Sequence, residues 1–225
     1  PKSISLKNLE SLSISNGRDV NLNKLVKKID INKIRQIILH RCVGKERSFP
    51  SLPNLETLVI KDKHCEKAKV YSNLSKLKNL RNLEFINLFN YNDDQTRWNT
   101  AEFDFTDINK LHFLKKLKLD NVNPEFLPPL KVLKNLKELD LSFKLITGDM
   151  GSDDGKIDPN LEDKDFEFLQ SMHQLKKLTI EFPIDHSNIK GPLFLSYLSK
   201  DLEELGISLH YEDNEINFAY KIINI

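Results

Sequence analysis

The sequence predicts an α/β solenoid, in which each repeat adds one short strand to a parallel β-sheet and covers one sheet face with a short helix or turn. Three observations predict this fold. The pattern apolar-x-x-apolar-x-x-apolar-x-apolar recurs eight times in 225 residues. Its last two apolar residues are two positions apart, which is the spacing along one face of a strand. The segments between occurrences are long enough for the crossover connections that parallel strands need.

The eight occurrences are located by the second apolar residue of each pattern. These anchors are Leu9, Ile34, Leu55, Leu80, Leu114, Leu136, Leu175 and Leu202. Five of the seven gaps between them are 21 to 27 residues long, which is the length of one compact repeat. The two longer gaps contain insertions at residues 87–110 and 143–171. We therefore predict a single domain of about eight repeats spanning residues 1–225.

The connecting segments predict a mixture of short helices and turns. Apolar residues at helical spacing predict helices over residues 22–29 and 166–172. Pro192 predicts the start of another helical turn, because proline is tolerated at the first helical position. The gap after Leu119 predicts an extended or single-turn segment, since it contains three prolines, Pro124, Pro128 and Pro129.

This pattern resembles the leucine-rich repeat family over about residues 4–211. The segments that carry the resemblance are LKNLESLSIS, LPNLETLVI, LKNLRNLEF, LKNLKELDLS and HQLKKLTI. The resemblance implies a horseshoe-shaped solenoid, with a concave parallel sheet of about eight strands and a convex side of short helices and turns. The departures of this sequence from the family pattern, described below, predict that the horseshoe is irregular. The resemblance also implies an Asn or Cys three residues after the last strand leucine, whose side chain bonds the backbone of the turn. In this sequence Cys42 is the only Asn or Cys at that position of any repeat. Polar residues lie one position earlier in four repeats: Asn16, Asp62, Asn87 and Asn121.

The C-terminal half departs from this regular pattern. Apolar alternation continues through Phe143, Phe182 and Leu209, which predicts longer strands in the last three repeats. Residues 216–222 alternate again after the turn-forming segment 212–215. We predict that they form an antiparallel hairpin with the last repeat strand and cap the sheet. A ninth parallel strand is the alternative, but four residues are too few for a parallel crossover.

Composition and motifs exclude several classes of function. The net charge of +1 is far from that of a protein that binds nucleic acid by bulk charge. No apolar run reaches the length of a membrane span. The sequence lacks phosphate-binding, metalloprotease and serine-hydrolase motifs, and its six histidines are scattered. We predict no catalytic residue, no cofactor and no metal site.

The resemblance implies that the concave strand positions form the binding surface. Ile38 and Val59 are adjacent apolar residues there, with Ile86 nearby, which is typical of a protein contact. Neighbouring strands also predict the ion pairs Lys116–Glu138 and Lys118–Asp140. The candidate binding residues are Gln36, Ile38, His40, Thr57, Val59, Lys61, Glu84, Ile86, Lys116, Lys118 and Asp140 on the strands, and Trp98 in the first insertion.

Charge is unevenly distributed along the chain. Residues 24–47 carry a net charge of +6 and residues 149–167 a net charge of −6. The acidic segment does not match the register of a calcium-binding EF-hand loop, and whether it is ordered or binds a cation stays open. Whether Cys42 and Cys65 approach each other also stays open.

These observations predict a non-catalytic protein-interaction module whose partner is an unidentified protein. The alternative is a recognition domain of a larger effector or receptor. The chain begins at Pro1, close to the first repeat, which leads us to expect a fragment of a longer protein. We take the chain as monomeric by default, and its localisation stays open, although the low cysteine content fits a reducing compartment.

Overall fold

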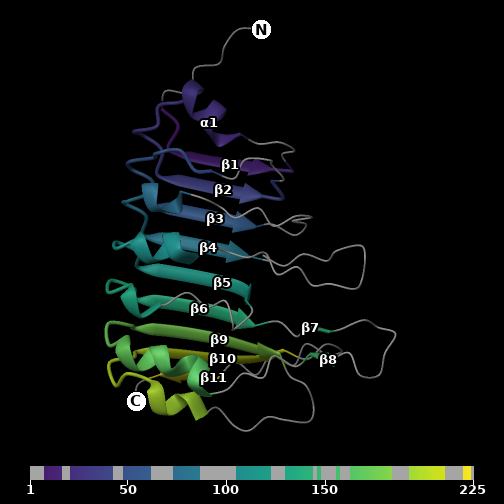
Figure 1. Ribbon diagram of the computed structural model, residues 1–225, viewed down its shortest axis with the longest axis vertical. Helices are drawn as coiled ribbons and strands as arrows, with labels where there is room; N and C mark the ends of the chain where they lie inside the picture. Colours follow the sequence, from purple (N-terminus) through teal and green to yellow (C-terminus); the bar gives the residue numbers. More distant parts are fainter. Residues whose placement is uncertain are drawn as a thin grey trace.

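The computed structural model shows an open sheet that grows strand by strand from the N-terminal to the C-terminal end (Figure 1). It describes residues 8–16, 21–42, 48–61, 73–86, 105–122, 130–143, 146–147, 156–157, 163–183, 193–210 and 220–223. Eight parallel strands form the main part of this sheet, and a ninth strand joins it in the antiparallel direction. The predicted α/β fold with an eight-stranded parallel sheet is therefore confirmed.

The strands follow the order of the chain, which is the arrangement expected of stacked repeats. In order, the parallel strands are β1 (Ser11–Ser15), β2 (Gln36–His40), β3 (Thr57–Lys61), β4 (Asn82–Ile86), β5 (Lys116–Val122), β6 (Glu138–Phe143), β9 (Lys177–Pro183) and β10 (Glu204–His210). The antiparallel strand β11 (Tyr220–Ile223) follows β10. Two short strands, β7 (Ile146–Thr147) and β8 (Lys156–Ile157), form a separate antiparallel pair within the second predicted insertion.

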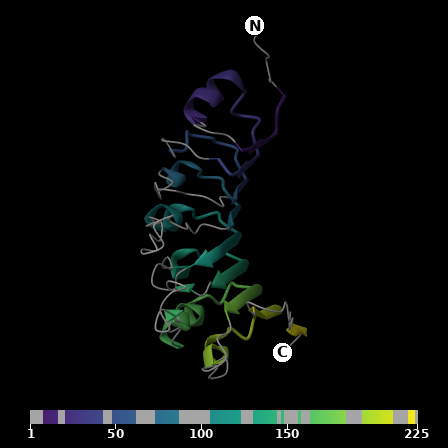
Figure 2. The same ribbon diagram turned by 90° about the vertical axis from the view of Figure 1, so that its right-hand side faces the viewer.

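Short helices lie along one side of the stack and the strands along the other (Figure 2). They are α1 (Leu22–Leu25), η1 (Val26–Lys28), η2 (Leu74–Lys76), η3 (Phe105–Lys110), η5 (Leu130–Val132), η6 (Asp163–Ser171) and η7 (Leu193–Tyr197). Helices were predicted in the segments of α1 and η1, η6 and η7, and an extended or single-turn segment in the gap that contains η5. Apart from α1, all are tight 3-10 helices, a form that suits short pieces used as connectors.

The core lies between the sheet and these helices. Leu58, Leu83 and Leu117 are fully buried at equivalent positions of neighbouring strands. The anchor residues that precede the strands are buried beside them, from Ile34 to Leu175. Each repeat therefore contributes its apolar positions to one continuous core, as the eight-fold pattern predicted.

Backbone hydrogen bonds show that the repeats are equivalent in space. Before each strand, one carbonyl accepts hydrogen bonds from two successive N–H groups of the next repeat. At the first junction the Glu10 carbonyl accepts from Arg35 and Gln36, at 2.8 and 3.1 Å. The same arrangement recurs at all seven junctions between the eight repeats, with the carbonyls of Glu10, Arg35, Glu56, Arg81, Lys115, Lys137 and Lys176 as acceptors.

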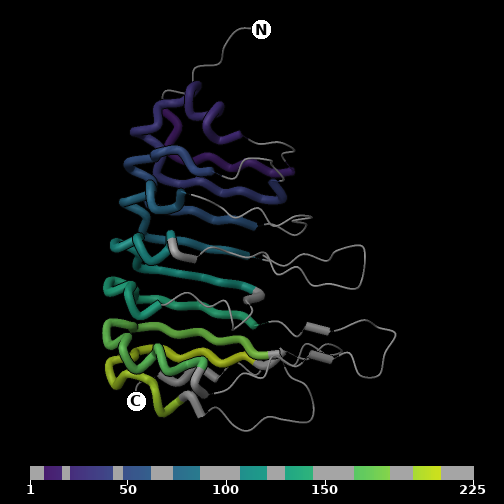
Figure 3. The backbone as a smooth tube through the Cα atoms, in the orientation of Figure 1, coloured from purple at the N-terminus to yellow at the C-terminus, as the bar shows by residue number. Residues whose placement is uncertain are grey.

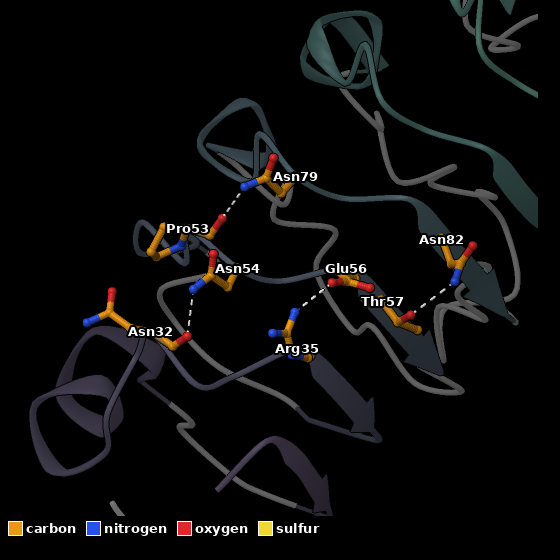
Figure 4. A network of polar contacts seen from close by, with 8 residues as sticks. All are labelled: Asn32, Arg35, Pro53, Asn54, Glu56, Thr57, Asn79 and Asn82. Atoms are coloured by element: carbon orange, nitrogen blue, oxygen red, sulfur yellow. Dashed lines mark hydrogen bonds and ion pairs between the residues drawn. The ribbon is translucent and has the colours of Figure 1, made fainter. Parts of the chain in front are cut away.

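A ladder of side-chain amides joins the repeats at the turn before the strands. Asn54 donates to the Asn32 carbonyl at 2.6 Å, and Asn79 donates to the Pro53 carbonyl of the preceding repeat (Figure 4). The equivalent donors further along are Asn135 to the His112 carbonyl (2.7 Å) and Gln174 to the Leu133 carbonyl (3.0 Å). The sequence analysis missed this ladder, although its signal, Asn between two anchor leucines, is visible in LPNL and LKNL.

The ladder is interrupted in the fifth repeat, where Phe113 occupies the amide position with 59% of its surface exposed. We expect Phe113→Asn to raise the free energy of unfolding by about 1 kcal/mol, because the new amide can donate to the Lys78 carbonyl and little apolar burial is lost. Urea denaturation followed by circular dichroism measures this change. Phe113→Ser is the control, since it removes the ring without supplying an amide. Equal stability of the two variants would contradict the prediction.

The strands lengthen in the C-terminal half, as predicted. β1 to β4 have five residues each, whereas β5, β9 and β10 have seven. The added residues Phe143 and Phe182 pack with Phe166 of η6 in a triangle, with ring centroids 5.9 to 6.0 Å apart. Polar residues hold the corresponding position in the early repeats, where Asn16 and Arg41 end the strand with positive φ.

The antiparallel strand of the predicted C-terminal cap is confirmed. β11 pairs antiparallel with β10, from Glu204 opposite Ile223 to Ile207 opposite Tyr220. The predicted turn at residues 212–215 lies outside the described residues, as do residues 216–219 at the start of the predicted strand. β11 places another strand beside β10, so that the last repeat does not form the edge of the sheet.

Candidate binding face

One face of the sheet has no covering layer among the described residues, whereas the other packs against the helices (Figure 2). Figure 3 traces the backbone of the stacked strands as a tube. We call the uncovered surface the open face. It is formed by alternate residues of each strand that point away from the core. In register, its first row is Ser11, Gln36, Thr57, Asn82, Lys116, Glu138, Lys177 and Glu204, and its second is Ser13, Ile38, Val59, Glu84, Lys118, Asp140, Thr179 and Gly206.

The N-terminal part of the open face is mostly uncharged. The Ser11 hydroxyl donates to the Gln36 side-chain oxygen at 2.9 Å, and the Asn82 amide donates to the Thr57 hydroxyl at 3.1 Å. These cross-strand bonds surround Ile38, which is partly exposed, with polar side chains of β1 to β4. This part of the face offers neutral hydrogen-bonding groups beside an aliphatic side chain.

The predicted apolar patch is smaller in the structure than the sequence indicated. Ile38 and Val59 are direct neighbours, but only 8% of Val59 is exposed, because it lies between the side chains of Ile38 and Glu84 on the adjacent strands. Ile86 stands beside Lys61 rather than beside Val59. Ile38 therefore remains the main apolar contact point of the patch.

The remaining part of the open face carries charges that pair with one another. Lys118 bonds Asp140 at 2.9 Å, as predicted, and Lys177 bonds Glu204 at 2.8 Å. The predicted pair Lys116–Glu138 is wrong. These two residues are register neighbours, but the Lys116 ammonium reaches the Glu84 carboxylate of β4 at 3.1 Å. Pairs this exposed contribute little stability each, but they neutralise the surface between β4 and β10.

These contacts also hold the lysines in their charged form. Burial acts to lower the pKa of Lys118, but the hydrogen bond and negative charge of Asp140, with Asp120 and Glu84, outweigh it and raise that pKa above its ordinary 10.5. The hydrogen bond that Lys177 donates to the Glu204 carboxylate similarly raises the pKa of Lys177. A raised lysine pKa adds stability that is complete below pH 10.5 and is lost as the pH rises through the folded-state value. Both lysines are therefore cationic at physiological pH.

Two residues that follow β2, Arg41 and Cys42, have distinctive local structure. The Cys42 thiol is buried and donates to the Ile14 carbonyl of the preceding repeat at 3.3 Å, which is the turn-bonding role predicted for its slot. Arg41 has a φ of 51°, in the left-handed region that bulky residues seldom adopt. Cys65 lies outside the described residues, so its predicted relation to Cys42 is not addressed.

The structure brings most of the predicted binding residues together on one surface. Gln36, Ile38 and His40 of β2 lie directly beside Thr57, Val59 and Lys61 of β3. Further along the same face the structure places Glu84 and Ile86 on β4, Lys116 and Lys118 on β5, and Asp140 on β6. Trp98 and most of both predicted insertions lie outside the described residues. Ser11 and Asn82 belong to the first row of the open face. The sequence analysis placed them on strands but did not include them among the binding residues.

Comparison with known proteins gives no match, either to a protein-family model or to a curated protein. Within the described part of the chain, no three His, Cys, Asp or Glu residues are grouped so that they could hold a metal ion. The same residues contain no helix with the length and apolar character needed to cross a membrane.

Proposed function

We propose that this chain is a leucine-rich-repeat module that binds a protein partner through its open face and has no catalytic activity of its own. The observation that carries the proposal is the asymmetry of the sheet in the described part of the chain, where one face packs against helices and the other has no covering layer. Extended faces of stacked repeats are the surfaces that such proteins use for binding. The repeated pattern, the seven equivalent junctions and the Cys42 turn bond support the assignment to this class.

The distribution of charge favours β1 to β3 as the contact region. Between β4 and β10 the open-face lysines pair with carboxylates of the same molecule, so a partner that used these charges would have to replace existing ion pairs. Around Ile38 the face presents an aliphatic side chain among mostly uncharged polar residues, with Lys61 as the nearest cationic residue on β3. An apolar contact with a polar rim is the usual composition of a protein interface.

A pair of matched substitutions tests this proposal. We expect Ile38→Glu to weaken partner binding at least about 10-fold, equivalent to ~1.4 kcal/mol, because it places a charge at the proposed contact. Val132→Glu is the control: Val132 is an exposed aliphatic residue on η5, away from the open face. Partners are captured from cell extracts, identified, purified and titrated against the three proteins after circular dichroism shows equal folding.

Two results would contradict the proposal. If both variants bind the purified partner as tightly as the wild type, the contact does not include Ile38 and the open face loses its support. If no extract yields a specific protein, the proposed class of ligand is wrong. In the alternative setting, as the recognition domain of a larger effector or receptor, the same substitution is expected to abolish target recognition by the whole protein.

A further inference from the structure

We propose that the side of the stack on which the strands begin binds a short acidic segment of a protein partner, at the starts of β4, β5 and β6. This side lies on the left of Figure 1 and is distinct from the open face. The inference goes beyond the proposed function, because it uses neither Ile38 nor the strand residues of the open face. It rests on a row of cationic side chains and on one exposed aromatic ring among them.

The residue immediately before each strand forms a row across the stack, which we call the edge row. In order, the edge row is Glu10, Arg35, Glu56, Arg81, Lys115, Lys137, Lys176 and Glu203. We call Arg81, Lys115 and Lys137 the cationic triplet. Its members are direct neighbours, because the Lys115 N–H donates to the Arg81 carbonyl and the Lys137 N–H to the Lys115 carbonyl, both at 2.7 Å. Neighbouring strands are about 4.8 Å apart, so the triplet spans ~10 Å.

The two ends of the edge row are neutralised, whereas the cationic triplet is not. Arg35 bonds Glu56 at 2.7 Å (Figure 4), and Lys176 bonds Glu203 at 2.8 Å. The triplet side chains are exposed, and within the part of the chain that the structure describes no carboxylate pairs with them. Like charges on adjacent strands repel one another, so a bound anion would relieve this repulsion.

Further basic residues lie beside the cationic triplet. The residues three positions before its members are also basic and exposed: Lys78, His112 and Lys134. The carboxylates that follow the edge row in these repeats, Glu84 and Glu138, belong to the open face, and Glu84 bonds Lys116 there at 3.1 Å. The surface at the starts of β4, β5 and β6 is therefore positive, although the net charge of the whole chain is only +1.

Phe113 is the exposed aromatic residue within this positive surface. It lies two residues before Lys115, with 59% of its surface exposed. It also interrupts the ladder of side-chain amides between Asn79 and Asn135. An amide at this position would continue the ladder, so the phenyl ring does not serve the fold there. A residue that breaks a local structural rule without a compensating gain is expected at functional sites.

An acidic peptide segment matches this combination of groups. Its carboxylates complement the cationic triplet, in which the Arg81 guanidinium has the planar fork that binds a carboxylate through two N–H groups. An aliphatic side chain of the same segment can lie against Phe113. A row of ~10 Å matches about three residues of an extended chain.

Single-stranded nucleic acid is the other polyanion that such a surface suggests. Proteins that bind it offer successive aromatic rings along a basic groove, so that neighbouring bases can stack. Among the side chains that the structure describes, Phe113 is the one exposed Phe, Tyr or Trp. The observations therefore favour the acidic peptide.

A fluorescein-labelled peptide, Gly-Asp-Glu-Leu-Asp-Glu-Gly, tests the proposal by fluorescence anisotropy at low ionic strength. We expect it to bind the wild type. The combined variant Arg81→Gln, Lys115→Gln and Lys137→Gln should raise the dissociation constant at least ~10-fold, with circular dichroism unchanged. The matched control, Lys24→Gln with Lys27→Gln and Lys28→Gln, makes the same change in net charge on the exposed lysines of α1 and η1, and should bind like the wild type.

Two changes to the assay test the chemistry of recognition. The same peptide with every carboxylate replaced by its amide should bind at least ~10-fold more weakly, because the charge complementarity is lost. Added salt should raise the dissociation constant of the acidic peptide, since exposed charges are screened.

Phe113→Asn separates binding from stability. This substitution should raise the dissociation constant of the acidic peptide ~3-fold, because the ring contact is lost, while it raises the free energy of unfolding. A purely structural role of Phe113 would not give these opposite effects. Phe113→Tyr keeps the ring and should bind like the wild type. Ile38→Gln should also leave peptide binding unchanged, which separates this surface from the open face.

Several outcomes would overturn the proposal. These are a wild type that does not bind the acidic peptide, equal losses in the triplet variant and the lysine control, and a loss in Ile38→Gln as large as that in the triplet variant. A labelled oligothymidylate of equal charge is titrated in parallel. Tighter binding of this oligonucleotide than of the peptide would mean that the surface recognises nucleic acid, and the proposed class of ligand would be wrong.

Discussion

Phe166→Ala is expected to lower the free energy of unfolding by about 3–5 kcal/mol, the cost of removing a large buried aromatic side chain. Phe166 is 3% exposed in η6 and holds that helix against β6 and β9 through Phe143 and Phe182. The ring pairs are worth about 0.5–1.5 kcal/mol each beyond the area that they bury. Removing Phe166 therefore costs both its burial and two of the three ring contacts.

The location of this loss is as informative as its size. Repeat proteins are stabilised by each repeat and its contacts with neighbours, so the damage should concentrate in the C-terminal repeats. Hydrogen exchange should show increased opening of β9 and β10 and little change in β2 and β3. Phe113→Ala is the control for loss of a ring, since Phe113 is mostly exposed and its removal should be nearly neutral. A loss below about 1 kcal/mol for Phe166→Ala would mean that the aromatic triangle does not hold η6.

Ile180→Ala and Ile207→Ala are expected to differ by about 2 kcal/mol, although both residues occupy the same position of adjacent repeats. They are register partners on β9 and β10. Ile180 is fully buried, whereas Ile207 is only partly buried at the end of the stack. Cavity formation in a closed core costs about 3–4 kcal/mol, and truncation at a partly open site costs less because less apolar contact is lost.

Equilibrium urea denaturation of the two isoleucine variants measures this difference. The comparison is controlled by design, because the substitution, the strand position and the side chain are identical. Equal losses would show that the two sites are packed equally well, and would contradict the burial seen at the C-terminal end. A larger loss for Ile207 would indicate that the β10–β11 pairing, and not the core, dominates stability there.

Regular features of the sequence were sufficient to predict the architecture. Apolar residues two apart define one face of each strand, and their eight-fold recurrence required stacked parallel strands. The turn-bonding role of Cys42, the longer strands around Phe143 and Phe182, and the antiparallel strand after β10 all followed from local patterns. The amide ladder was overlooked, although the repeated asparagine in LPNL and LKNL was its signal.

The positions of the candidate residues on the sheet were predictable, but the contacts between their side chains were not. Alternation along the strands placed Gln36, Ile38 and His40 beside the side chains of β3. It did not reveal that Lys116 reaches backwards to Glu84 instead of across to Glu138. A lysine side chain can reach the neighbouring strand on either side. Which of two carboxylates it contacts depends on their positions in space.

The sequence by itself determined the repeat, the strand positions and the division of each strand into core and open-face residues, because these depend on periodicity along the chain. Tertiary structure alone decided how deeply each equivalent position is buried, since burial depends on the neighbours that a residue acquires on both sides. Val59 is nearly buried by its flanking strands, whereas Leu12 and Ile207, in the first and last of the described repeats, are only partly buried. The same apolar pattern therefore forms a closed core in the middle repeats and a less closed one in the first and last described repeats.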